Sequence, residues 1–266
     1  MRTFAVVPTY NESANILRLL DSLLSLGIRG LCPLVVDDNS PDGTSHLVAD
    51  YARAHDNVYL LQRMGDKGRG TAGVAGFDLA LRLGADAIVE MDADFSHPPH
   101  VVPHLLSALE QADIAIASRL AFAALDGRAS SRKVITALAN RYARTFLEMS
   151  AHKSRVRDWT TGFRAYRRSV FEKVPPGTLI SKGPSILQEI LFRALNQGCT
   201  AVEIPFNMQD RAAGKSTFSR KIMKQSLLSI PCYRLLFQGG REFHVSASHT
   251  RSEDDRHFVI ERRDWR

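Results

Sequence analysis

The stretch VEMDADFSHPPH, from Val89 to His100, is an apolar run that ends in two carboxylates one residue apart. On a strand, side-chain alternation would place Asp92 and Asp94 on one side of the backbone, where they repel each other unless a positive charge lies between them. Mg²⁺ and Mn²⁺ prefer oxygen ligands and are commonly held by one or two carboxylates together with phosphates. Taken alone, the stretch is explained equally well by solvated or helix-capping aspartates, with Ser96 as a cap.

Apolar runs rich in Val and Ile alternate with segments of helical period along most of the chain. The predicted strands are TFAVVPTY (3–10), CPLVVDDNS (32–40), NVYLLQR (57–63), DAIVEMDAD (86–94), DIAIASR (113–119) and TAVEIPF (200–206). The predicted helices span 12–26, 44–54, 71–83, 101–109, 134–149 and 185–196. This alternation predicts an α/β fold with an open, mostly parallel sheet flanked by helices.

Polar residues end four of the predicted strands, in the motifs PTYNE (8–12), DDNSPDG (37–43), MDADFSH (91–97) and ASR (117–119). In open parallel sheets ligands bind outside the carboxyl ends of the strands, so these motifs should gather at one edge. Asp38 could accept hydrogen bonds from a nucleobase there, whereas a turn suffices to explain Asp42. The Gly-rich segment 64–77 suits either a phosphate-binding loop or an ordinary flexible loop.

The chain has 266 residues and a formal net charge of +7, which favours partners that carry phosphate, such as nucleotides, anionic lipid surfaces or nucleic acids. Its three cysteines show neither CxxC nor histidine spacing, so we expect no disulfide framework, no zinc site and a reducing compartment. The N-terminus lacks the apolar core of a signal peptide. No run approaches the roughly 18 apolar residues that a membrane-spanning helix needs.

The second half of the chain departs from the βα pattern, and three parts are expected. These are a catalytic domain over 1–217, a basic amphipathic segment over 218–238 and a charged C-terminal tail over 239–266. The second part suits an anionic membrane surface, and equally a core-packing helix broken at Pro231. No nucleic-acid recognition motif is present.

A resemblance to a known family is carried by eight motifs, which occur in the order VVPTYNE, VVDDNSPDGT, KGRGTAGVAGF, MDADFSHPP, ASR, TTGFRAY, QEILFRA and EIPFNMQDRAAGKS. The set resembles the polyprenol (dolichol) phosphate mannose synthases of glycosyltransferase family 2, over about residues 4–219. The resemblance implies a GT-A, Rossmann-like fold. It also implies a sugar nucleotide donor, usually GDP-mannose, and a polyprenyl monophosphate acceptor.

The resemblance also assigns roles to individual residues. Those implied for the nucleotide-sugar site are Pro8, Tyr10, Glu12, Asp38 and Asp92. Those implied for the Mg²⁺ or Mn²⁺ site are Asp92 and Asp94, with Ser96 where relatives often have Gln. Those implied for phosphate contacts, mainly to the acceptor, are Arg119, Arg132, Arg211 and Lys215. The closing motif departs from the family pattern, because Thr217 stands where Lys is expected and Lys215 lies two positions earlier.

The expected reaction is inverting transfer, in which Asp94, Arg119 and Arg211 act at the reacting groups. A phosphomonoester nucleophile, mostly ionised near neutral pH, needs no general base. The expected location is cytoplasmic, at the membrane surface. One alternative is a soluble family 2 transferase with a non-lipid acceptor, for which Glu189 is the candidate base. Another is a non-catalytic binding protein, which would be expected to lose the metal carboxylates.

Overall fold

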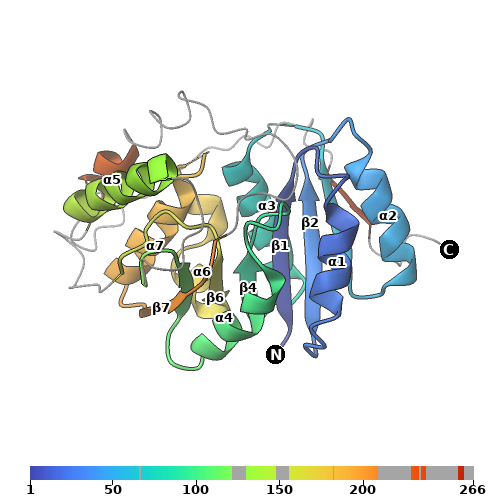
Figure 1. The fold of residues 1–266 in the computed structure, drawn as a ribbon, viewed down its shortest axis with the longest axis horizontal. Helices are drawn as coiled ribbons and strands as arrows, with labels where there is room; N and C mark the ends of the chain where they lie inside the picture. The colour runs from blue at the N-terminus through green and yellow to red at the C-terminus, as the bar shows by residue number, and fades with distance from the viewer. Residues whose placement is uncertain are drawn as a thin grey trace.

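The computed structural model describes residues 1–65, 67–121, 130–147, 156–181, 183–208, 229–233, 235–237 and 257–260. Strands in these residues form one eight-stranded mixed sheet with the order β7-β5-β6-β4-β1-β2-β3-β8 (Figure 1). The strands are β1 (Thr3–Thr9), β2 (Leu31–Asp37), β3 (Tyr59–Arg63), β4 (Ala87–Glu90), β5 (Ile114–Ser118), β6 (Arg164–Arg167), β7 (Ala201–Pro205) and β8 (His257–Ile260).

The centre of the sheet is parallel, and its strand order reverses beside β1. The chain runs from β1 to β2 and β3 on one side, then returns to β4 on the other side of β1, and all four strands run parallel. Such a reversal opens a crevice at the carboxyl ends of the strands, where α/β proteins bind ligands. Strand β6 is antiparallel to both β4 and β5, and β8 is antiparallel to β3.

Helices cover both faces of the sheet, as the continuous apolar strands require. They are α1 (Ile16–Leu24), α2 (Thr44–Ala54), α3 (Arg69–Arg82), α4 (Val102–Ala108), α5 (Ser130–Leu147), α6 (Arg168–Lys173) and α7 (Ile186–Asn196). Along β1, Phe4 and Val6 enter one apolar cluster, whereas Ala5 and Val7 enter the other. This is the two-residue alternation of a strand buried on both sides.

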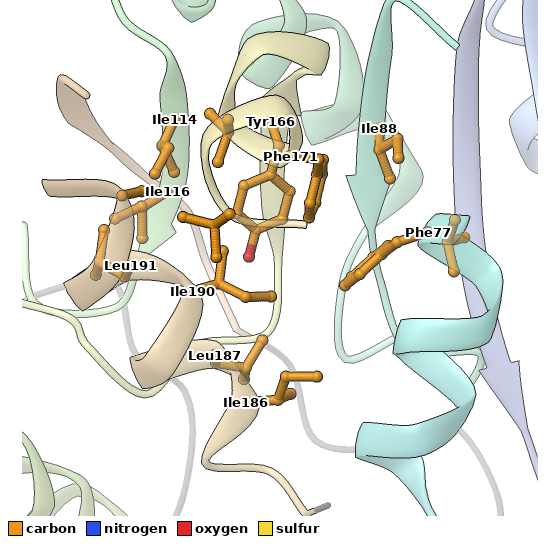
Figure 2. Close-up of a cluster of buried hydrophobic side chains, with 14 of the residues drawn as sticks. Phe77, Ile88, Ile114, Ile116, Tyr166, Phe171, Ile186, Leu187, Ile190 and Leu191 are labelled. Carbon is orange, nitrogen blue, oxygen red and sulfur yellow. The ribbon is translucent and has the colours of Figure 1, made fainter. Parts of the chain in front are cut away.

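The larger cluster lies between the sheet and helices α3, α6 and α7. Figure 2 shows Phe77 of α3 and Ile88 of β4 facing Tyr166 and Phe171, with Ile190 of α7 below them. The Phe77 and Phe171 ring centroids lie 5.1 Å apart. This packing holds the middle of α3, where Phe77 lies, against the sheet side of the cluster.

Most predicted elements are confirmed, and two strands were not predicted. Strand β6 lies in a basic, aromatic segment where Arg164 replaces the apolar residue expected of a buried strand. Strand β8 lies within the predicted charged tail. Strand β4 ends at Glu90, so Asp92 and Asp94 lie in the loop after it and not on the strand.

The predicted amphipathic segment over 218–238 falls largely outside the described residues. Its described parts, 229–233 and 235–237, are helical, and Tyr233 is buried against the larger apolar cluster. None of the helices in the described parts of the chain is both long enough and apolar enough to cross a membrane.

Helix α3 approaches the sheet closely at Gly76. A Cβ atom there would lie 2.5 Å from Val6 Cγ1 and 2.9 Å from Val36 Cγ2. We therefore expect Gly76→Ala to lower the free energy of unfolding by about 1–3 kcal/mol in urea denaturation, because stiff valines on strands cannot give way. Gly177→Ala, where no atom lies within 4 Å of the added Cβ, is the control and should be near neutral. Equal stability of both variants would contradict the close packing.

Candidate active site

The loops that follow β1, β2 and β4 meet at one edge of the sheet. The Asn11 N–H donates to Ser40 Oγ at 2.9 Å, and Ser40 Oγ donates to Asp37 Oδ1 at 2.6 Å. Three non-glycine residues of these loops have left-handed backbones, namely Asn11 (φ 61°), Asn39 (φ 52°) and Phe95 (φ 62°). Strained backbone of this kind collects at functional sites, where the surrounding structure enforces it.

Asp38 joins the end of β2 to the Gly-rich loop. Its Oδ1 accepts a hydrogen bond from Arg63 Nη1 at 2.5 Å, and its Oδ2 accepts one from the Gly68 N–H at 2.7 Å. Burial raises the pKa of Asp38, and these two donors offset part of the rise. Both oxygens already accept protein hydrogen bonds, so the predicted contact with a nucleobase stays a prediction.

Tyr10, in the loop after β1, and Lys67, in the Gly-rich loop, contact each other at the surface. The Tyr10 side chain is 40% exposed, and Lys67 Nζ lies 4.9 Å from the centre of its ring. Pro8 is half-buried at the end of β1, and the Glu12 N–H donates to Thr44 Oγ1 at 3.0 Å. The structure thus places these predicted nucleotide residues at the end of β1 and in the loop after it, and their contacts with a nucleotide stay a prediction.

Asp94 is oriented by Ser96. The Ser96 N–H and hydroxyl donate to Asp94 Oδ1 at 3.0 and 2.6 Å, across a turn that Phe95 makes with its left-handed backbone. Asp94 is only 3% exposed. Ser96 therefore positions the predicted metal-binding carboxylate. Direct ligation by Ser96 itself stays a prediction.

Asp92 is paired with Arg69, the first residue of α3. Arg69 Nε and Nη2 donate to Asp92 Oδ1 at 3.0 and 2.6 Å, and Nη1 donates to Glu90 Oε1 at 3.2 Å. Burial raises the pKa of Glu90 to about 7, against the opposing charges of Arg69 and Arg164. Sequence analysis missed both Arg69 and Glu90, although each lies inside a motif that it quoted.

His97 fixes the loop that carries the two aspartates. The Asp92 N–H donates to His97 Nδ1 at 2.9 Å, so Nδ1 is unprotonated and the neutral ring carries its proton on Nε2. The ring stacks on Phe163 at 4.9 Å between centroids and meets Phe206 edge-on. Burial lowers the pKa of His97, which favours the neutral ring.

The side chains at this edge supply some, but not all, of the ligands that a hard divalent cation needs. Asp92 and Asp94 supply carboxylate oxygens, which Mg²⁺ and Mn²⁺ prefer. Within the described ranges no group of three His, Cys, Asp or Glu side chains is placed to hold a metal. The two carboxylates therefore fit a site in which a substrate supplies further oxygens.

Arg119, at the end of β5, is bound to Asp158. Its Nε and Nη2 donate to the two Asp158 oxygens at 2.8 and 2.7 Å, and Nη2 also donates to Thr160 Oγ1 at 2.6 Å. Asn140 of α5 donates to Thr160 Oγ1 and accepts from the Trp159 N–H at 2.6 Å. Sequence analysis missed Asp158, and the predicted contact of Arg119 with a phosphate stays a prediction.

The other predicted basic residues divide between described and undescribed parts of the chain. Arg132 is exposed in the first turn of α5. Arg211 and Lys215 lie outside the described residues, as does Thr217.

Glu189, the candidate base of the soluble-transferase alternative, is buried in α7. Its oxygens accept hydrogen bonds from the Ile180 and Ser181 N–H groups, both at 2.9 Å. Arg193 Nη1 lies 3.4 Å from Oε1. These contacts favour a structural role for Glu189 and weaken the alternative that depends on it.

Comparison with known proteins identifies the family. Residues 4–175 match the family described as "Glycosyl transferase family 2". The chain belongs to this family. The family 2 transferase is 37% identical over 236 residues to the polyprenol monophosphomannose synthase of Mycolicibacterium smegmatis, covering 86% of this chain and 85% of that protein. It is 35% identical to the undecaprenyl-phosphate mannosyltransferase of Micrococcus luteus, covering 86% and 93% of the two chains.

Solved structures confirm the GT-A fold of the family 2 transferase. Glucosyl-3-phosphoglycerate synthase from Mycobacterium tuberculosis, crystallised with Mn²⁺, UDP-glucose and phosphoglyceric acid, superposes with a TM-score of 0.63. The sequence identity is 18%, and the match covers 87% of this chain and 80% of that one. At this identity the likeness concerns the fold alone.

The Arg119–Asp158 pair predicts an acid-dependent loss of stability. Although burial raises the pKa of Asp158, Arg119 holds it at about 2, below the ordinary value of 3.8. The pair therefore stabilises the fold above pH 4, and its contribution is lost as the pH falls through about 2. At pH 7 we expect Asp158→Asn to lower the free energy of unfolding by about 3 kcal/mol or more, because Arg119 stays buried without its carboxylate.

Urea denaturation of both proteins at several pH values measures this effect. The stability difference between wild type and Asp158→Asn should shrink between pH 4 and pH 2. Asp50→Asn, which removes an exposed ion pair with Arg53, is the control and should change little. A difference that does not depend on pH would contradict the assigned pairing.

Proposed function

We propose that this family 2 transferase moves mannose from GDP-mannose onto a polyprenyl monophosphate, with inversion at the anomeric carbon. The observation that carries the proposal is the position of Asp92 and Asp94. They lie in the loop after β4, beside the strand-order reversal and next to the Gly-rich loop. The relatives named as polyprenol monophosphomannose synthase and undecaprenyl-phosphate mannosyltransferase support the choice of sugar and acceptor.

The donor is proposed to lie across the ends of β1, β2 and β4. The exposed Tyr10 ring and half-buried Pro8 offer apolar surface to the base, and Lys67 brings a positive charge within 4.9 Å of that ring. Gly68, tied to Asp38, lets the Gly-rich loop approach the diphosphate with backbone N–H groups.

A divalent cation on Asp92 and Asp94 would neutralise the charge that grows on the departing nucleoside diphosphate. Ser96 holds Asp94 in place for this role, and the His97 ring holds the Asp92 backbone. Because both carboxylates are fixed before substrate binds, little reorganisation is needed at the moment of reaction.

The acceptor phosphate is proposed to enter from the β5–α5 side. Arg119 directly follows β5 and Arg132 lies in the first turn of α5, so the described chain carries basic groups along this side. Arg211 and Lys215 are proposed to complete the phosphate contacts. Since a phosphomonoester is already mostly ionised near neutral pH, the reaction needs no general base, and alignment of the two substrates carries most of the rate.

Helix α5 is proposed to rest on the cytoplasmic membrane surface. Val134, Ile135 and Leu138 are 57, 55 and 61% exposed on this helix, beside exposed Arg132 and Arg141. A basic helix with an exposed apolar side suits an anionic bilayer surface. In the described part of the predicted amphipathic segment, Leu235 is a further exposed apolar side chain, at 76% exposure.

The proposed function is tested with labelled donors. Purified protein is incubated with labelled GDP-mannose or UDP-glucose, with and without Mg²⁺ and a polyprenyl phosphate. Label should enter the organic phase only from GDP-mannose, and only when both metal and lipid are present. Transfer solely to water-soluble acceptors would overturn the proposal.

The role of Asp94 predicts the effect of a single substitution. Asp94→Asn keeps the shape of the side chain and removes its charge, so we expect kcat to fall by about 100-fold or more. Circular dichroism and urea denaturation should show an intact fold. Asp78→Asn, on the exposed side of α3, removes a carboxylate paired with Arg82 and should leave kcat unchanged. An active Asp94→Asn enzyme would refute the metal assignment.

A further inference from the structure

Asp92, one of the two proposed metal-binding carboxylates, already forms an ion pair with Arg69. Arg69 reaches Asp92 Oδ1 with two N–H groups, at 2.6 and 3.0 Å. Its third contact is with Glu90 Oε1 at 3.2 Å. The side chains of Arg69, Asp92 and Glu90 are 27, 29 and 1% exposed. The guanidinium is therefore partly shielded from water, and its charge acts strongly on Asp92.

The surrounding structure is shaped to hold this guanidinium. A Cβ atom at residue 162 would lie 2.5 Å from Arg69 Nη2 and 3.2 Å from Cζ, so Gly162 leaves the space that the group occupies. Glu90 anchors the other side, and its Oε2 is buried with no hydrogen-bond partner in the described structure. The end of β4 and the loop before β6 thus lie on two sides of Arg69, which begins α3.

We propose that Arg69 is a positioning residue that weakens divalent-metal binding at Asp92 until the nucleoside diphosphate arrives. This inference rests on the proposed function, in which Asp92 and Asp94 hold the metal. Metal and nucleotide binding are then coupled: the cation binds weakly without the nucleotide and more tightly with it.

The charges explain the coupling. A divalent cation that approaches Asp92 is repelled by Arg69, and the described residues offer it only the carboxylates of Asp92 and Asp94. The diphosphate supplies oxygen ligands together with negative charge, which offsets the repulsion. Glu90 holds Arg69 from its other side, so the guanidinium stays beside Asp92 when the metal binds.

Mn²⁺ affinity, measured by electron paramagnetic resonance with and without GDP, tests this proposal on the full chain. Wild-type protein should bind Mn²⁺ weakly alone and more tightly with GDP. Arg69→Met should bind Mn²⁺ about tenfold or more tightly without GDP, because the repulsion is gone, and should gain less from GDP. Arg69→Lys keeps the charge and should retain most of the weak binding seen in the wild type.

Two further variants make the outcome decisive. Arg82→Met removes an exposed positive charge from the same helix and should leave Mn²⁺ affinity unchanged. Asp92→Asn should lose Mn²⁺ binding in the presence of GDP. If Asp92→Asn binds as the wild type does, the proposed metal site is wrong. If it loses binding while Arg69→Met binds no more tightly than the wild type, the metal site stands and the role of Arg69 is overturned.

A double variant tests the proposal if Arg69→Met does not fold. Removing Arg69 takes away the cation that contacts buried Glu90, and loss of one partner of a buried ion pair destabilises proteins strongly. The double variant Arg69→Met/Glu90→Gln also removes the Glu90 charge and is compared with Glu90→Gln alone. The double variant should again bind Mn²⁺ more tightly without GDP, and equal affinities of the two would overturn the proposal.

Discussion

Three carboxylates follow one another within five residues at the end of β4, and the guanidinium of Arg69 contacts two of them. Together with Arg164, this cation offsets the cost of burying Glu90 beside Asp92, because like charges in a shielded place repel strongly. Since Arg69 is the first residue of α3, the same contact fixes the start of this helix to β4. The Asp38–Gly68 hydrogen bond then fixes the Gly-rich loop to β2.

The loop before β6 joins the two sides of the site that we propose for donor and acceptor. Asp158 in this loop holds Arg119 at the end of β5, and Gly162 makes room for Arg69 at the end of β4. Asn140 binds the same loop to α5. One irregular segment therefore contacts both the arginine beside the carboxylates proposed for the metal and the helix proposed for the membrane.

Local patterns predicted the strands and helices well where each strand is apolar on both faces. The pattern failed at β6, because Arg164 is buried there and its Nη1 and Nη2 atoms donate to the carbonyl oxygens of Leu187 and Trp159. These acceptors lie on other segments, so no local pattern shows them. It also extended β4 past Glu90. The alternation of polar and apolar residues continues through Asp94, but the left-handed backbone of Phe95 and the His97 contact with the Asp92 N–H belong to a loop.

The sequence by itself determined the order of the βα units and which oxygen-bearing side chains follow each strand, because hydrophobic periodicity and turn residues act over a few neighbours. Only the tertiary structure decided which charge neutralises which. The pairs Arg69–Asp92, Arg63–Asp38 and Arg119–Asp158 join residues 23, 25 and 39 positions apart. A buried charge requires a partner close in space, and folding alone brings such partners together, so no local pattern could have shown that Arg69 stands at the proposed metal site.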